Sequence, residues 1–193
     1  MLKLPESLSQ ERSKEDQLSF EQLVAQYSDM VYNTALSMLQ QQQDAEDVTQ
    51  EVFVKVYQSM GKFSGNAQIS TWIYRITVNQ CIDVEKKKNR KKRFSGVLQF
   101  FSSALNDSVH VADFHHPGIA LEKKEDAAIL FKALQQLNTK QRMVFVLNKL
   151  EGLKAKEIAE IMQASATAIE SLLARANKQL KIILKQYYEQ HHK

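Results

Sequence analysis

Aromatic and hydrogen-bonding side chains gather in one stretch of the sequence, between Lys62 and Gln80. An unpaired DNA base has an exposed flat face, on which aromatic rings stack, and a free pairing edge, to which polar side chains hydrogen-bond. The stretch therefore predicts a surface for unpaired DNA, and Trp72 has a second interpretation as a buried core anchor. The candidate residues are Lys62, Phe63, Ser64, Asn66, Gln68, Thr71, Trp72, Arg75 and Asn79.

A second candidate lies between Leu137 and Leu180, where two helical patterns meet at Gln163–Ala164–Ser165. Ser165 is a suitable N-cap for the second helix. Gln163 occupies the position at which such a turn usually has Gly, because the backbone there requires a positive φ. A non-Gly residue at that position destabilises the turn by about 1 kcal/mol. The pattern predicts a helix-turn-helix, whose second helix lies in the DNA major groove. The alternative is a pair of amphipathic helices in an ordinary helical core.

The second of these helices offers side chains for reading duplex DNA. Ile169, Leu172 and Leu173 take the inward positions, so the residues between them face outward. A carboxylate at Glu170 can accept a hydrogen bond from cytosine N4, although it can equally pair with a neighbouring cation and read nothing. Basic residues further along the helix suit phosphates. The candidates are Ser165, Thr167, Glu170, Ser171, Arg175 and Lys178.

Charged residues mark two further surfaces. Asp47, Gln50 and Glu51 lie within about one helical turn and form an acidic, hydrogen-bonding face, which Phe53 and Tyr57 extend. The alternative is a charge cluster that only stabilises its own helix. Seven of the eight residues from Lys86 to Arg93 are Lys or Arg, in a chain of net charge +4. That run either tracks a phosphate backbone or is solvated.

The composition argues against a catalytic or metal site. The single cysteine, Cys81, lies on an apolar helical face and can build neither a disulfide framework nor a zinc site. All five histidines fall in the predicted linker or the C-terminal tail, and no phosphate-binding Gly loop occurs. The N-terminus is polar, without a signal peptide or membrane span. We expect no cofactor, no membrane insertion and a cytoplasmic location.

Few glycines and prolines and the absence of long apolar–polar alternation predict an all-α fold. Three helices are expected in the first half of the chain. The first covers 18–39, the second begins near Asp44, whose carboxylate can cap it, and the third covers 69–88. Between Phe94 and Gly118 there is no Lys or Arg, and small polar residues accumulate. We therefore expect two small helical domains joined by a flexible linker. The expected divisions are a tail at 1–17, a domain at 18–90, a linker at 91–121 and a domain at 122–190.

Two blocks of this sequence resemble bacterial sigma factors. The run from Asp44 to Asp83 is similar to their second region, and the helix-turn-helix at 137–180 resembles their fourth region. With no domain between them, the chain resembles the short extracytoplasmic-function (ECF) members of the sigma-70 family. The resemblance implies a non-enzymatic protein that binds the beta-prime and beta subunits of core RNA polymerase and directs the enzyme to promoter DNA. It also implies an anti-sigma partner.

The resemblance assigns roles to the candidate surfaces. It implies that Asp47, Gln50 and Glu51 dock on the polymerase, that the residues from Lys62 to Asn79 bind the minus-ten element, and that the second helix of the helix-turn-helix binds the minus-thirty-five element. Similar proteins usually carry Lys or Arg where this chain has Glu170 and Leu172. Two other hypotheses remain: a helix-turn-helix regulator that binds duplex DNA without polymerase, and a helical interaction protein. The first would need a dimer surface, and no extended heptad seam is visible.

Overall fold

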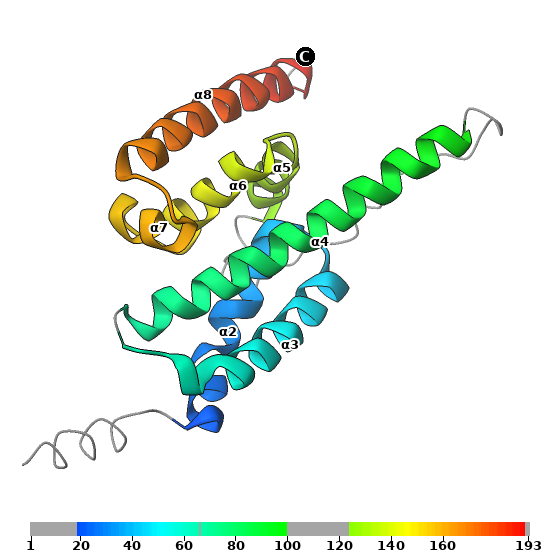
Figure 1. Cartoon of the computed structure of the whole chain (residues 1–193). Coiled ribbons are helices and arrows are strands. Elements are labelled where there is room, and N and C mark those ends of the chain that lie inside the picture. Colours follow the sequence, from blue (N-terminus) through cyan, green and yellow to red (C-terminus); the bar gives the residue numbers. More distant parts are fainter. Residues whose placement is uncertain (1–18, 66, 100–123, 192–193) are drawn as a thin grey trace, which may run out of the picture.

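The computed structural model describes residues 19–65, 67–99 and 124–191, with side chains described up to Arg90 and again from Asp126 to Gln190. Within these residues the protein is built from helices and the turns between them, which confirms the predicted all-α fold (Figure 1). The expected N-terminal tail and the part of the expected linker from 100 to 121 lie outside the described residues.

The first two helices form an antiparallel pair. Helix α2 (Phe20–Leu39) begins in a capping box, in which Ser19 and Gln22 bond each other's backbone N–H groups, and ends at Gln40 in the left-handed conformation (φ 53°). Helix α3 (Gln42–Ser59) follows at once. The helix begins two residues before the predicted start near Asp44, and the predicted cap is wrong, because extended Gln41 is the N-cap and Asp44 lies inside the first turn. There the Asp44 carboxylate pairs with Lys88 of the next helix.

Helix α4 (Ile69–Gln99) is longer than predicted. It follows a short 3-10 turn, η1 (Met60–Lys62), and its last turns project beyond the other helices (Figure 1). The expected end at Lys88 is wrong, because the basic residues that follow are good helix formers and continue the same helix. The first nine residues of the predicted linker, 91–99, are therefore helical.

The C-terminal helices complete the molecule. Helix α5 (Lys124–Gln135) precedes α6 (Thr139–Phe145), which continues into a π-helical turn, η3 (Val146–Leu150). Helix α7 (Ala155–Met162) and helix α8 (Ala166–His191) follow, and α8 packs on α5, α6 and α7. Gly152 (φ 72°) makes the turn from η3 to α7, at a backbone conformation that favours glycine.

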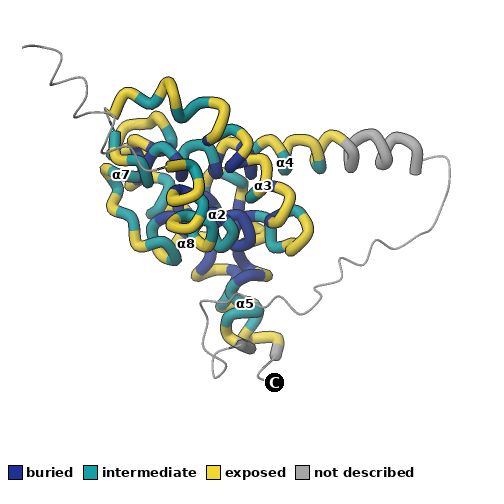
Figure 2. The backbone as a smooth tube through the Cα atoms, turned by 90° about the horizontal axis from the view of Figure 1, so that it is seen from below, coloured by how far each residue is buried: buried dark blue, intermediate teal, exposed yellow. Residues whose placement is uncertain are grey.

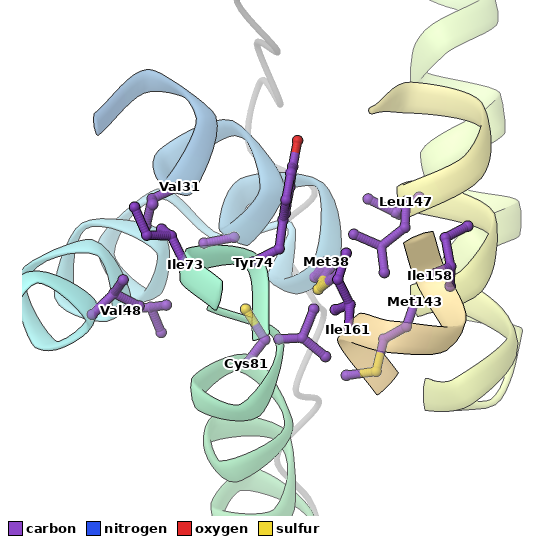
Figure 3. Close-up of a cluster of buried hydrophobic side chains, with 14 of the residues drawn as sticks. Val31, Met38, Val48, Ile73, Tyr74, Cys81, Met143, Leu147, Ile158 and Ile161 are labelled. Atoms are coloured by element: carbon purple, nitrogen blue, oxygen red, sulfur yellow. The ribbon is translucent and has the colours of Figure 1, made fainter. Parts of the chain in front are cut away.

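The hydrophobic core joins the two halves of the chain. One cluster of buried side chains runs from α2, α3 and α4 into α6, η3 and α7, and its members include Val31, Ile73, Leu147, Ile158 and Ile161 (Figure 3). A second, smaller cluster lies between α5, α6 and α8. Buried positions gather toward the middle of the molecule (Figure 2). The N-terminal helices (α2–α4) and the C-terminal helices (α5–α8) therefore pack directly on each other.

Candidate nucleic-acid interface

Helix α3 carries an exposed stripe that we call the α3 face, consisting of Asp47, Gln50, Glu51, Val54 and Tyr57. All five are exposed, and the Tyr57 ring, 65% exposed, is held edge-on against Phe20 of α2 at a centroid distance of 5.2 Å. Sequence analysis missed Val54, although its spacing from Asp47 and Gln50 places it on the same side of the helix. An acidic surface that ends in exposed apolar groups suits contact with another protein.

Phe53 is not part of this surface. We expected it to extend the acidic face, but its side chain is only 8% exposed and belongs to the hydrophobic core. It follows buried Val52 directly, and the two side chains together turn one wide apolar face of α3 toward α2 and α4. Phe53 can therefore support the α3 face only from beneath.

The loop before α4 brings together several of the residues expected to bind unpaired DNA. The rings of Phe63 and Trp72 lie 5.0 Å apart at 37° and are both half-buried, so each is partly core and partly surface. Gly65 (φ 70°) allows the loop to turn beside them. Exposed polar side chains at Lys62, Ser64 and Gln68 surround the loop, and Asn79 is exposed further along α4. Asn66 lies outside the described residues.

Two of the expected DNA-binding residues are engaged within the fold. Arg75 donates a hydrogen bond from Nη2 to the backbone oxygen of Glu160 in α7, at 2.8 Å. Thr71, one turn earlier, is buried. Between them, the Tyr74 hydroxyl donates to Glu151 Oε2 at 2.9 Å.

The buried Tyr74–Glu151 pair has shifted ionisation. Burial raises the pKa of the Glu151 carboxyl, although the hydrogen bond from Tyr74 acts in the opposite direction. Burial, together with the nearby Glu151 charge, raises the pKa of Tyr74. The turn that holds Glu151 is fixed by Gly152 and by Asn148, whose side chain donates to the backbone oxygen of Leu153 at 2.9 Å. Tyr74 therefore remains a hydrogen-bond donor at physiological pH.

The predicted helix-turn-helix is confirmed in its local geometry. Gln163 adopts the left-handed conformation (φ 52°, ψ 47°) that the turn requires, and the N–H of Ala164 bonds to the backbone oxygen of Ala159 at 3.0 Å. The Ser165 hydroxyl caps α8 by accepting from the N–H of Ala168 at 3.1 Å. Because its side chain already caps the helix, Ser165 is engaged within the motif itself.

The outer side of α8 presents the other residues proposed for duplex DNA. Five side chains are exposed there: Thr167, Glu170, Ser171, Arg175 and Lys178. Ile169 between them is fully buried. No cation among the described residues lies within ion-pair distance of the Glu170 carboxylate, which leaves that group available to a ligand.

The basic run on α4 divides into paired and exposed cations. Lys88 pairs with Asp44 and also donates to the side chain of Gln41 at 2.8 Å, and Lys86 lies 3.5 Å from Asp83. Lys86, Lys87 and Arg90 are exposed. Lys91, Lys92 and Arg93 continue the helix, and their side chains lie outside the described residues.

Cys81 is fully buried, as expected, and burial raises the pKa of its thiol to about 12. Among the residues that the structure describes, no group of His, Cys, Asp or Glu is arranged to hold a metal ion. None of the described helices has the length and apolar character needed to cross a membrane.

Comparison with known proteins agrees with this arrangement. The family model for sigma-70 region 2 matches residues 23–91, and the model for sigma-70 region 4 matches residues 127–180. The chain is 30% identical over 168 residues to the ECF RNA polymerase sigma factor SigW of Bacillus subtilis, covering 87% of this chain and 90% of SigW. It is 29% identical over 165 residues to the ECF sigma-E factor of Escherichia coli, covering 86% of each.

Two solved structures share the fold. The sigma factor RpoE from Bartonella quintana, solved with the anti-sigma factor NepR, superposes with a TM-score of 0.64 at 22% identity, covering 86% of this chain and 96% of RpoE. CnrH, solved with the cytosolic domain of CnrY, gives a TM-score of 0.60 at 23% identity, covering 86% and 88%. Regions 2 and 4 in this order define the sigma-70 class. The chain belongs to the ECF RNA polymerase sigma factors within that class.

Proposed function

We propose that this chain binds core RNA polymerase in the cytoplasm, directs it to particular promoters and promotes the opening of the DNA there. The observation that carries the proposal is that one chain exposes two separate faces, the α3 face and the outer side of α8. The first has the charge and apolar groups of a protein contact. The second has the geometry of a recognition helix. A factor that connects an enzyme to a DNA site needs both.

Each part of the proposed DNA contact has a physical role. The N-terminal turns of α8 would enter the major groove, where Thr167, Glu170 and Ser171 meet base edges, while Arg175 and Lys178 meet phosphates. The paired rings of Phe63 and Trp72, with Lys62, Ser64 and Gln68 around them, would hold unpaired bases of the minus-ten element. The chain supplies binding and positioning, and the polymerase supplies catalysis.

An anti-sigma factor is included in the proposal. The structures of RpoE and CnrH that share this fold were solved with the anti-sigma factor NepR and with the cytosolic domain of CnrY. A partner of this kind would compete with polymerase for the exposed surfaces of the chain.

A DNA-binding assay with and without core polymerase tests the proposal. The purified chain is incubated with a pool of genomic fragments, alone and with core enzyme, and the retained fragments are sequenced. We expect enrichment of a shared pair of sequence elements only when core enzyme is present. Selective retention of the same fragments by the chain alone would instead favour a helix-turn-helix regulator that acts without polymerase.

A further inference from the structure

Helix α8 divides into two parts of different charge. Its N-terminal turns belong to a stretch without Lys or Arg, which runs from Glu157 to Ala174 and includes the acidic Glu170. Its later turns carry four exposed cations at steps of three, three and four residues. The charge that suits DNA therefore lies beyond the turns proposed to read bases. We call these four residues the α8 cation stripe: Arg175, Lys178, Lys181 and Lys185.

The α8 cation stripe lies on one face of the helix. Steps of three and four residues keep side chains on the same side of an α-helix. The opposite face is held against the core by Ala176, Leu180 and Ile183, which are buried. Thr167 and Ser171 precede the stripe at the same kind of spacing. The cations therefore continue the outer side of α8 that is proposed to meet base edges.

Helix α8 is longer than the DNA groove that it would enter. It runs as one helix from Ala166 to His191 (Figure 1). At a rise of about 1.5 Å per residue, Lys185 lies about 27 Å beyond Thr167 along the axis. The major groove is only about 12 Å wide and has a row of phosphates along each edge. Because the groove winds around the duplex, a helix of this length leaves it and passes beside the phosphates at its edge.

The cations of the stripe are not held by strong partners within the fold. Lys185 lies 3.6 Å from Glu189, and the two side chains are 73% and 63% exposed. An exposed pair of this kind contributes little stability, so the Lys185 ammonium group can exchange the carboxylate for a phosphate. The other three cations have no acid of the described residues within ion-pair distance. All four charges can therefore be directed to DNA.

We propose that Lys181 and Lys185 bind phosphates of the duplex beside the minus-thirty-five element and supply affinity that the base-reading turns of α8 lack. The proposal rests on the proposed function, because it takes α8 as the helix that enters the major groove. The charge of the stripe and its continuity with the base-reading side favour duplex phosphates as the partner. Both lysines lie beyond residue 180, where the match to the region 4 model ends. Phosphate contacts carry no sequence information, so α8 separates the reading of bases from the supply of affinity.

Salt titrations of the full-length chain test the proposal. Fluorescence anisotropy gives the affinity for a labelled duplex of mixed sequence at several salt concentrations, and circular dichroism checks helical content. The double variant Lys181→Gln/Lys185→Gln should lower the slope of log affinity against log salt by about 1.8, at about 0.9 for each lost phosphate contact. Lys132→Gln/Lys140→Gln is the matched control, because it removes the same charge from exposed positions on α5 and α6. The control should keep the native slope.

A proximity measurement separates direct contact from the electrostatic field of the whole protein. Cys81 is fully buried, so a cysteine introduced on the surface can be labelled selectively with an iron–EDTA group that cleaves nearby DNA. A label on Lys185→Cys should cleave the duplex, as should a label on Ser171→Cys in the base-reading turns. Lys132→Cys is the control and should cleave least. Cleavage from Ser171→Cys alone would show that the end of α8 lies away from DNA and would overturn the proposal.

The double variant Arg175→Gln/Lys178→Gln distinguishes failure of this proposal from failure of the proposed function. If it lowers the slope and Lys181→Gln/Lys185→Gln does not, the end of α8 makes no phosphate contact and the proposal is wrong. If neither variant lowers the slope, α8 does not bind DNA, and the role proposed for the whole helix is wrong as well. A control pair that lowers the slope equally would show that only net charge matters, which also overturns the proposal. Binding to polymerase is tested separately, by the assay with core enzyme.

Discussion

Glu170 carries a negative charge on a helix that is proposed to bind negatively charged DNA. Its carboxylate is exposed on the outer side of α8, no cation of the described residues pairs with it, and it would be repelled by phosphates. It can accept a hydrogen bond from cytosine N4 in the major groove. We therefore predict that it selects a cytosine in the minus-thirty-five element at the expense of overall affinity.

Binding of holoenzyme to promoter fragments with single base changes checks this prediction. Glu170→Ala should lose about 1–3 kcal/mol of discrimination at one base pair. Glu189→Gln is a matched control, because it removes an acidic charge at the far end of the same helix. If Glu170→Ala raises affinity equally for every sequence and leaves the base preference unchanged, the carboxylate reads no base.

Glu151 gives the fold a predictable dependence on pH. Burial raises the pKa of its carboxyl in the folded chain, so folding favours the protonated form. The resulting stabilisation is fully present below the unfolded pKa and is lost as the pH rises through the folded pKa. Glu151→Gln keeps an acceptor for Tyr74 without the charge. Its melting temperature should match the native protein at acidic pH and exceed it at neutral pH, by about 2–4 °C for each kcal/mol gained.

Thermal unfolding at a series of pH values, followed by circular dichroism, measures that difference. Glu160→Gln is a suitable control, because Glu160 is exposed on α7 and its pairing with Arg75 uses only the backbone. A constant difference between Glu151→Gln and the native protein at all pH values would contradict the assignment.

At the scale of the element, the α3 face should carry binding to polymerase. Changing Asp47, Gln50 and Glu51 together to Ala should weaken the complex with core enzyme by at least tenfold. Helical content should be retained, because exposed polar substitutions change stability little. The matched control changes Gln42, Gln43 and Glu46, which are exposed at the start of the same helix. Analytical ultracentrifugation with core enzyme measures the affinity. Equal affinity for both triple variants would contradict the prediction that the α3 face binds polymerase.

The basic run on α4 should contribute to DNA binding through its exposed cations. Changing Lys86, Lys87 and Arg90 to Gln should reduce the slope of log affinity against log salt by about 0.9 for each phosphate that the protein no longer neutralises. Lys88→Gln is the comparison, because Lys88 is already paired with Asp44 and should change the slope least. A titration with salt that gives the same slope for all variants would mean that the run is only solvated.

Several features of the elements could be predicted from local sequence because their causes are local. Ser165 caps α8 through a bond within three residues, and the turn at Gln163 follows from the spacing of apolar residues on either side. The end of α4 could not be placed, because a run of Lys and Arg suits both a helix and a solvated segment. Phe53 follows Val52 directly and is buried with it, because the apolar face of α3 is wide enough to cover two consecutive residues.

At the scale of the whole molecule, the contact between the two regions could not be predicted from the sequence. The pairs Tyr74–Glu151 and Glu85–Arg142 join residues that are far apart in the chain and have no local signature. Sequence analysis correctly separated two helical regions, but it treated Thr71 and Arg75 only as candidates for DNA. In the structure Arg75 bonds to the backbone of α7 and Thr71 is buried, and no local pattern in the sequence indicates either role.

Transcription of genomic DNA in vitro, with the 5′ ends of the RNA mapped, tests most directly the claim that this chain is a promoter-selecting factor. Core polymerase is assayed alone and with the purified chain. We predict a set of start sites that appear only when the chain is added, and that share two upstream sequence elements at constant spacing. Identical start sites with and without the chain, under conditions in which the chain is folded, would contradict the account.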